Sequence, residues 1–291
     1  MAAAALPHAL SLLLIALILD AVIAWVPGLR AVLHAPADAT ARLVGWLDRR
    51  LNRERRSAGT RFARGFIVVV VIAALAGAIG YGLATATTDP RSADIVAVAV
   101  LLLLLSQRAP FDAARRVARH MPDDDHAAAR AAIADLATSL AAGVVGVTFW
   151  YVLLELVGLG LPGVCATRAV HWTAVRIGTR GIFGRAAVGL DAALGAFPAI
   201  IAAVLLTLAA IFAPRGSPFG AMRQAGRTPE KPSVGAMAGA LGFALGNGPW
   251  IGAGRARLVA QDVRTASYLY AVAALLHLGT VAAAFAAYSP I

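Results

Sequence analysis

Residues 66–86 have the sequence FIVVVVIAALAGAIGYGLATA, and no charged side chain occurs between Arg64 and Asp89. At a rise of about 1.5 Å per residue, roughly 20 consecutive apolar residues in a helix cross the hydrocarbon core of a bilayer. A helix of this length in a soluble domain would carry a polar face. The stretch therefore predicts a membrane-spanning helix.

The rest of the chain has the composition of a membrane protein. Of its 291 residues, 60% are hydrophobic and 14% are charged, which is well outside the usage of soluble domains. Further apolar stretches occur at residues 9–29, 95–106, 136–161, 194–213 and 269–288. We therefore predict an all-α, polytopic integral membrane protein. It would have five or six apolar spans in a single membrane-embedded domain over residues 1–291.

Shorter segments are expected to form amphipathic or re-entrant helices on the cytoplasmic side. Residues 41–53 place four apolar side chains at helical spacing among arginines, which predicts an amphipathic helix lying in the interface. Residues 107–120 form a basic helical segment, and residues 234–245 are apolar but too short for a full span. The aspartates at 123–125 favour a helix start near His126, because acidic side chains complement the positive end of the helix dipole.

The basic residues indicate a lipid bilayer rather than a polynucleotide as the partner. The chain carries 26 Lys and Arg against 15 Asp and Glu, a net charge of +11. Most of the cations lie between the apolar stretches, as in the cytoplasmic loops of membrane proteins, and no nucleic-acid recognition module accompanies them. We therefore expect no nucleic-acid binding.

Counting these cations favours an N-terminus outside the cytoplasm. The cytoplasmic loops 30–64, 108–132 and 214–266 would then hold nine, five and seven basic residues, and the outer loops 87–93 and 160–193 one and four. The positive-inside bias supports this orientation.

The four arginines of residues 160–193 are the exception. Either the 136–161 stretch bends back to its own side, through Gly143 and Gly146, or the chain contains another partial span.

Two carboxylates fall within or at the end of apolar stretches. Asp20 lies in the middle of one, where an ionised carboxylate is costly unless paired, so it is either functional or paired within its own surroundings. Glu155 is close enough to a span end to reach the interface. Cys165 is the single cysteine, and His171 and His277 have no second ligand at a suitable spacing. We therefore expect no metal site at Cys165, His171 or His277.

Six segments resemble motifs of the CobD/CbiB family of cobalamin synthesis. They occur in the family's order across residues 17–254. Their sequences are ARLVGWLDRRLNR (41–53), SQRAPFDAARRVAR (106–119), LAAGVVGVTFWYVL (140–153), PGVCATRAVHWTAVRIGTR (162–180), LDAALGAFPA (190–199) and GAMAGALGFALGNGP (235–249).

The resemblance implies a multi-pass protein of the bacterial inner membrane. It also implies an amide-forming ligase reaction, in which aminopropanol or its phosphate is joined to the free propionate of adenosylcobyric acid with ATP and Mg²⁺. Corrinoid intermediates and other proteins of the pathway would be the partners. Magnesium binds carboxylate oxygens and water, so such a site needs acidic side chains.

The chain departs from the family pattern mainly by losing such side chains. Residues 134–142 lack the two glutamates, the asparagine and the aspartate of the corresponding family segment. His171 and Ala174 replace an asparagine and an aspartate, and Asp191 survives beside Ala192 where the family has a second aspartate. Whether the chain is an enzyme therefore stays open at this point.

The predicted binding residues for substrate or phosphate come from the resembling motifs. Arginine can bind either group bidentately. Lipid-headgroup contacts and structural ion pairs are the alternative roles for these residues. The six residues are Gln107, Arg108, Asp112, Arg168, Arg180 and Asp191, with no catalytic residue assigned.

Three functions remain. The first is an active synthase that uses substitute carboxylates. The second is a catalytically inactive homologue that serves as a membrane scaffold, partner subunit or corrinoid-binding protein. The third is a small transporter, which is disfavoured because few polar residues lie within the spans.

Overall fold

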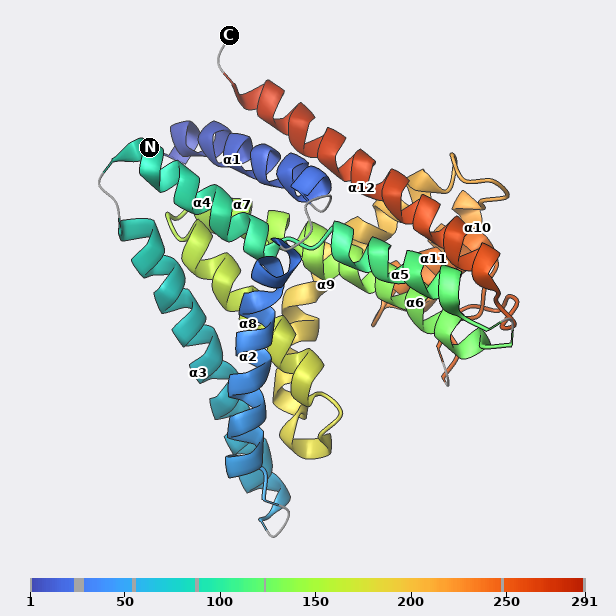
Figure 1. Ribbon diagram of the computed structural model, residues 1–291, viewed down its shortest axis with the longest axis horizontal. Helices are drawn as coiled ribbons and strands as arrows, with labels where there is room; N and C mark the ends of the chain where they lie inside the picture. The colour runs from blue at the N-terminus through green and yellow to red at the C-terminus, as the bar shows by residue number, and fades with distance from the viewer. Residues whose placement is uncertain are drawn as a thin grey trace. The chain divides into compact units, whose positions relative to one another are not determined.

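A computed structural model describes residues 2–23, 29–53, 56–86, 89–122, 124–246 and 249–289 (Figure 1). Within these residues the structure is helical apart from turns, loops and two isolated β-bridges. In chain order the elements are α1 (Ala2–Ile23), α2 (Leu29–Leu51), α3 (Ala58–Thr85), α4 (Pro90–Leu104), α5 (Arg108–His120), α6 (His126–Ser139), the π-helix η1 (Leu140–Val145), α7 (Gly146–Glu155), α8 (Gly160–Ile177), the 3₁₀ turn η2 (Gly181–Phe183), α9 (Arg185–Ala209), α10 (Pro218–Arg227), α11 (Pro232–Leu241) and α12 (Ala260–Tyr288).

Five helical stretches in the described parts of the chain are long and apolar enough to cross a membrane. They are Ala58–Thr85, Pro90–His120, His126–Glu155, Arg185–Ala209 and Ala260–Tyr288. Apolar side chains such as Phe66 and Ile67 on α3 are about half exposed, 51% and 55%, as expected for a lipid-facing surface. The predicted all-α, polytopic class is confirmed. The predicted first span, residues 9–29, corresponds to α1, and its end beyond Ile23 lies outside the described residues.

The third of these stretches corrects the predicted bend at Gly143 and Gly146. The helix begins at His126, where the Asp125 side chain accepts a hydrogen bond from the Ala128 backbone N–H at 3.0 Å, as the acidic run predicted. Asp123, another member of that run, lies outside the described residues. The helix then continues through η1 to Glu155, because a π-helical turn absorbs an extra residue without reversing the chain. The chain therefore does not bend back at the two glycines.

The helices form two compact units, which we describe separately. Unit 1 contains Met1–Leu105, Val147–Gly195 and Tyr288–Ile291, and unit 2 contains Ser106–Gly146 and Ala196–Ala287.

Residues 160–193 are not the outer loop that the sequence predicted. Residues 160–177 form α8, which packs against α3 in unit 1. A Cβ atom added at Gly80 would lie 2.8 Å from the Leu161 carbonyl oxygen, and one added at Gly65 would collide with the Phe183 carbonyl oxygen. The first part of α3 therefore lies near the residues that follow α8, and the later part of α3 lies near the start of α8. The two helices are antiparallel. The hydropathy signal missed α8 because the helix carries Arg168 and Arg176, of which Arg168 is buried by its neighbours and Arg176 is exposed.

The amphipathic segment at residues 41–53 also packs on this pair. It forms the C-terminal part of α2, where Val44 is fully buried and Leu47 and Leu51 pack against the same core. Leu43 and Trp46 stay exposed, and the Arg50 guanidinium lies 5.0 Å from the centroid of the Trp46 ring. The core itself consists of Val44, Val68, Val69, Ile72, Ala169, Val170, Ala174, Ile177, Phe183 and Ala187.

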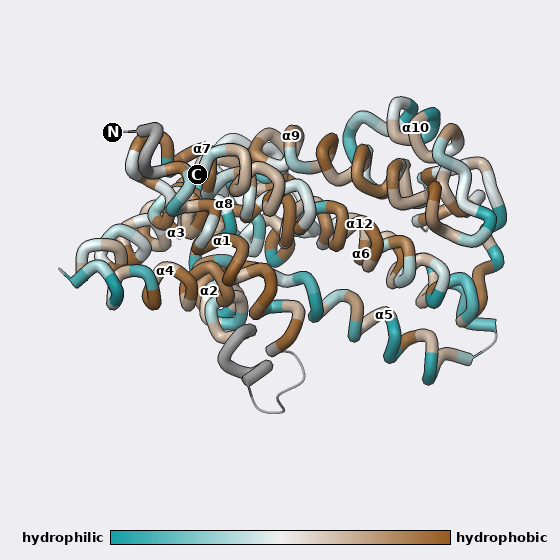
Figure 2. Tube along the Cα trace, turned by 90° about the horizontal axis from the view of Figure 1, so that it is seen from above, coloured by the Kyte–Doolittle hydropathy of each residue, from teal (hydrophilic) through white to brown (hydrophobic). Residues whose placement is uncertain are grey.

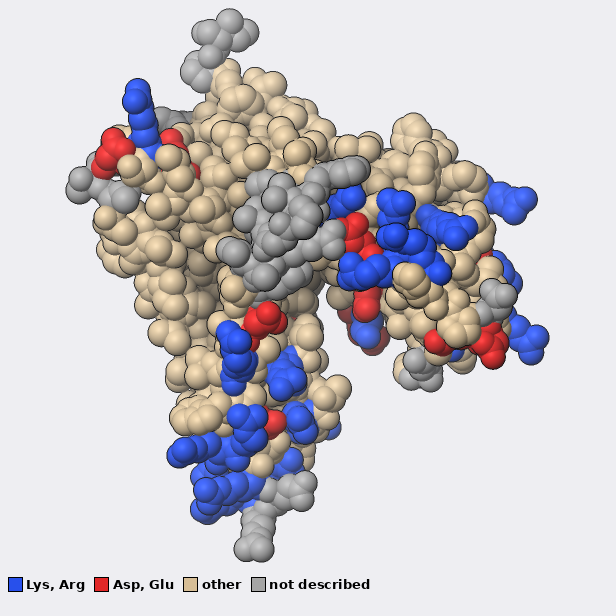
Figure 3. Space-filling view, viewed as in Figure 1, with Lys and Arg blue, Asp and Glu red and all other residues tan. Residues whose placement is uncertain are grey.

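One end of unit 1 gathers the arginines of two distant segments. Arg180, just after α8, pairs with Asp48 of α2 at 3.3 Å, and Arg61 donates to the Asn52 side-chain oxygen at 3.0 Å. Figure 3 shows the resulting group of Lys and Arg at the lower end of α2 and α3. Arg180, which follows α8, therefore lies with the basic residues of the 30–64 loop. This placement accounts for one of the four arginines that the loop count left as an exception.

Unit 2 contains the segment predicted as re-entrant or interfacial at residues 234–245. It forms the short helix α11, which is mostly buried and packs against α10 and α6. Glycines at 220 and 239 allow the close approach of α10 and α11. Arg130 of α6 donates to the carbonyl oxygens of Gly246 and Ala256, and so holds the loop that leads to α12.

We expect Gly65→Ala to lower the thermal stability of the detergent-solubilised protein, by about 1–3 kcal/mol, because the added methyl group overpacks the contact between α3 and Phe183 of η2. Gly59→Ala is the matched control in the same helix, since a Cβ there meets no atom within 4 Å. Thermal unfolding followed by circular dichroism compares the two. Equal midpoints for both variants would contradict the close packing of α3 on η2, the turn that follows α8.

We expect α8 to return the chain across the membrane. In a Cys165→Ala background, cysteines at Val157 and Arg185, both exposed, flank α8 and η2. A membrane-impermeant maleimide applied to right-side-out and inverted vesicles should label the two positions from opposite sides. Labelling of both from one side would show that α8 does not cross.

Candidate functional site

Unit 1 brings together three polar side chains from α8 and α9. Arg168 and His171 share one face of α8, since they are three residues apart in a helix. The His171 Nδ1 lies 3.1 Å from one carboxylate oxygen of Asp191 on α9. Asp191 also interacts electrostatically with Arg168. We call Arg168, His171 and Asp191 the α8 cluster.

The α8 cluster is buried at Arg168 and partly open at its other two members, since the side chains of His171 and Asp191 are 21% and 31% exposed. Arg168 is only 7% exposed, and its guanidinium lies 5.1 Å from the centroid of the Trp172 ring. A guanidinium and an imidazole facing one carboxylate give the cluster a net positive charge whenever His171 is protonated. Such a site suits a carboxylate or a phosphate, which arginine binds through paired N–H groups.

The structure separates Arg180 from the other two predicted residues of unit 1. Arg180 pairs with Asp48, and its side chain is about half exposed, whereas Asp191 pairs with His171 and interacts electrostatically with Arg168. Sequence reasoning treated His171 as isolated because its carboxylate partner is 20 residues away in the chain. Asp191 is an aspartate that this chain shares with the family motif, and the motif before it carries Arg168 and His171. The presence of both motifs was the signal that could have linked His171 with Asp191.

Unit 2 holds the other three predicted residues at a break in a candidate span. Helix α4 ends at Leu104 and α5 begins at Arg108, so residues 105–107 are not helical. Gln107 at the break is 9% exposed, and Arg108 pairs with Asp112 at 3.2 Å. Arg108 also lies over the Phe111 ring, 5.3 Å from its centroid.

The backbone at this break is held by residues that sequence reasoning missed. The Ser106 N–H donates to the Gly143 carbonyl oxygen at 3.1 Å, within the π-helix η1. The Tyr270 hydroxyl of α12 donates to the Gln107 carbonyl oxygen at 2.6 Å. Broken membrane helices and π-helical turns are common at binding sites, because they free backbone groups for ligands. Neither feature has a sequence signature that could have been found beforehand.

The two carboxylates that the sequence analysis placed within or at the end of apolar stretches have different surroundings. Asp20 is 5% exposed within α1. Glu155 ends α7 and accepts a hydrogen bond from the Gly160 backbone N–H, at the first residue of α8. A carboxylate at a helix N-terminus is favourable, so Glu155 has a structural role at this turn.

The carboxylates present fit a magnesium site poorly. Asp112 is paired with Arg108, and Asp191 with His171. Where the structure describes the chain, no three His, Cys, Asp or Glu side chains are grouped as a metal would require. Magnesium in phosphate-transfer sites takes one or two carboxylates plus phosphates and water, and these carboxylates are neutralised by neighbouring cations.

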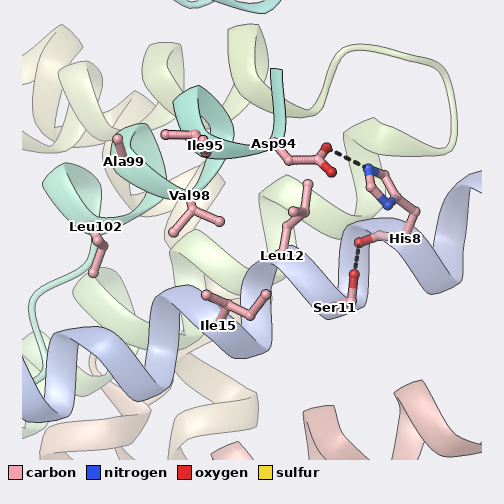
Figure 4. A pocket seen from close by; sticks show the side chains of 9 residues that line it. All are labelled: His8, Ser11, Leu12, Ile15, Asp94, Ile95, Val98, Ala99 and Leu102. Carbon is pink, nitrogen blue, oxygen red and sulfur yellow. Dashed lines mark hydrogen bonds and ion pairs between the residues drawn. The ribbon is translucent and has the colours of Figure 1, made fainter. Parts of the chain in front are cut away.

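A separate groove lies between α1 and α4 in unit 1 (Figure 4). It has a volume of about 500 Å³ and mostly apolar walls, including Leu12, Ile15 and Val98. At one end His8 and Asp94 form an exposed pair at 2.9 Å. The groove contains none of the six predicted binding residues, so it is not part of the candidate site.

We expect Asp191→Asn to destabilise the protein by roughly 2 kcal/mol, because it removes a carboxylate beside a buried guanidinium. Asp94→Asn is the control, since its exposed pair with His8 contributes at most about 1 kcal/mol. Thermal unfolding in one detergent compares the two variants. A smaller effect at Asp191 than at Asp94 would contradict the role of Asp191 as the counter-charge of the α8 cluster.

Comparisons with known proteins agree with this assembly of motifs. A family model described as CobD/Cbib protein matches residues 13–138. The cobalamin biosynthesis protein CobD of Rhizobium meliloti is 30% identical over 326 residues, which cover 94% of this chain and 97% of the relative. The protein of that name in Brucella anthropi is 28% identical over 320 residues, covering 94% and 96%. No solved structure is significantly similar to the chain. The chain belongs to the CobD/CbiB family.

Proposed function

We propose that this CobD-type cobalamin biosynthesis protein binds a corrinoid intermediate through the α8 cluster, in the bacterial cytoplasmic membrane. The observation that carries the proposal is the buried Arg168, which faces Trp172 and lies beside His171 and Asp191. A corrinoid intermediate such as adenosylcobyric acid offers a free propionate, and a guanidinium is the side chain best suited to bind it.

Binding by the α8 cluster requires no magnesium. The paired state of Asp112 and Asp191 disfavours a resident Mg²⁺ at either residue, so ATP-driven activation of the carboxylate is not assigned to this chain. Other proteins of the pathway would then carry out the coupling, and this chain would present the corrinoid to them at the membrane.

A second candidate function is the complete synthase reaction. It is favoured by one observation, the match to CobD proteins over nearly the whole chain. In that case aminopropanol or its phosphate would be joined to the propionate, and Arg168 would hold the carboxylate in place. ATP and Mg²⁺ would supply the activation, through ligands other than the paired carboxylates.

A coupling assay separates the two candidates. The purified protein in detergent receives adenosylcobyric acid, aminopropanol phosphate, ATP and Mg²⁺, beside an active family member as the positive control. We expect no amide product above a heat-killed sample. Product at a rate near that of the active member would replace the first candidate with the second.

We expect Arg168→Gln to weaken corrinoid binding about tenfold or more, because it removes a charged hydrogen-bond donor from a buried site. Equilibrium dialysis of adenosylcobyric acid against protein in nanodiscs measures the affinity. Arg91→Gln is the control, since Arg91 is exposed at the start of α4. Equal binding by both variants, with both folded, would exclude the α8 cluster as the site.

A further inference from the structure

Helix α10 of unit 2 has one buried face and one exposed face. The Ser217 side chain caps its start by accepting a hydrogen bond from the Gly220 N–H at 3.0 Å. Ala221 is fully buried, on the side where Gly220 approaches α11. The outer face is therefore fixed by the packing of α10 on α11.

This outer face carries large apolar side chains that no described residue covers well. Phe219 is 81% exposed and Met222 is 62% exposed, and they are three residues apart on the same side of the helix. In water, a phenylalanine exposed to this extent gains nothing from the hydrophobic effect. Because α10 is packed and still exposes two large apolar side chains, we infer that a partner covers its outer face.

The exposed apolar surface continues into the end of a candidate span. Just before α10, Ile211 and Phe212 are 62% and 59% exposed, and they follow directly on α9, a helix apolar enough to cross a membrane. Both segments belong to unit 2. The chain therefore passes from lipid-facing residues to α10 within a few residues, which argues for the same lipid phase as the partner of Phe219 and Met222.

The charged side chains of α10 and of the turn before it are all basic, and the nearest acidic residue, Glu230, follows the helix. Arg215, Arg223 and Arg227 are exposed, and no acidic residue occurs from 210 to 229. Figure 2 shows hydrophilic turns next to hydrophobic ones at α10. Arginines beside aromatic and aliphatic side chains are typical of helices that lie in the interface of anionic membranes.

We propose that α10 is an interfacial docking helix that binds the anionic lipid surface. Phe219 and Met222 insert at the boundary between headgroups and acyl chains, while Arg215, Arg223 and Arg227 contact lipid phosphates. Sequence reasoning did not predict this helix, because two apolar residues among glycines and arginines form too short a pattern.

Spin labelling of the full-length protein tests the proposal. Cys165 is the single cysteine of the chain, so a Cys165→Ala background leaves each introduced cysteine as the one label site. Nitroxides are placed by Phe219→Cys and Met222→Cys, with Glu230→Cys as the matched control in the exposed turn after α10. In nanodiscs containing anionic lipid, collision rates with oxygen report on lipid, and those with a water-soluble nickel complex report on solvent.

We expect nickel collisions at positions 219 and 222 to be several-fold lower than at 230, with oxygen collisions higher. Arg223→Gln combined with Arg227→Gln should reduce this difference, as should nanodiscs of zwitterionic lipid alone. Nickel collisions at 219 and 222 equal to those at 230 would overturn the proposal, because the face would then be in water. Labels shielded from both reagents would also overturn it, since a protein partner or a second copy would then cover the face.

Discussion

The close antiparallel contact between α3 and α8 is the constraint on which unit 1 depends. Glycines at 65 and 80 let the α3 backbone approach the Phe183 and Leu161 carbonyl oxygens, with no side chain between. This approach covers α8, which carries Arg168 and His171 and would be costly to expose to lipid. A strongly apolar helix thus shields a helix that hydropathy alone would not place in a membrane. The same contact brings Arg180 to the end of α2, where it forms an ion pair with Asp48.

The α8 cluster follows from that packing. A guanidinium inside a membrane protein needs an anion and polar contacts, and Asp191 supplies the charge from α9. His171 and Trp172 complete the surroundings from the same helix as Arg168. An ion pair of this kind adds little net stability compared with apolar packing. Its retention in a chain that has lost most of the family's acidic residues is consistent with a binding role, and that role underlies the proposed function.

Unit 2 satisfies its irregular backbone by different means. Non-helical segments at membrane depth are tolerated only where other groups bond their N–H and C=O groups. At the break between α4 and α5, the Gly143 carbonyl oxygen and the Tyr270 hydroxyl meet this need. Arg130 likewise donates hydrogen bonds to backbone carbonyl oxygens of the loop before α12. The sequence predicted none of these contacts, because each joins residues far apart in the chain.

The sequence by itself determined that this protein is a helical membrane protein of the CobD/CbiB type. Uninterrupted apolar runs such as residues 66–86 encode a span locally, and the helix start near His126 follows from its own acidic neighbour Asp125. Only the tertiary structure decided that α8 is a packed helix, that His171 meets Asp191, and that Arg180 belongs with Asp48 instead. The reason is physical. Hydropathy measures the tendency of a segment to leave water, whereas a charged helix is held in place by the partners that cover it, and those partners lie elsewhere in the chain.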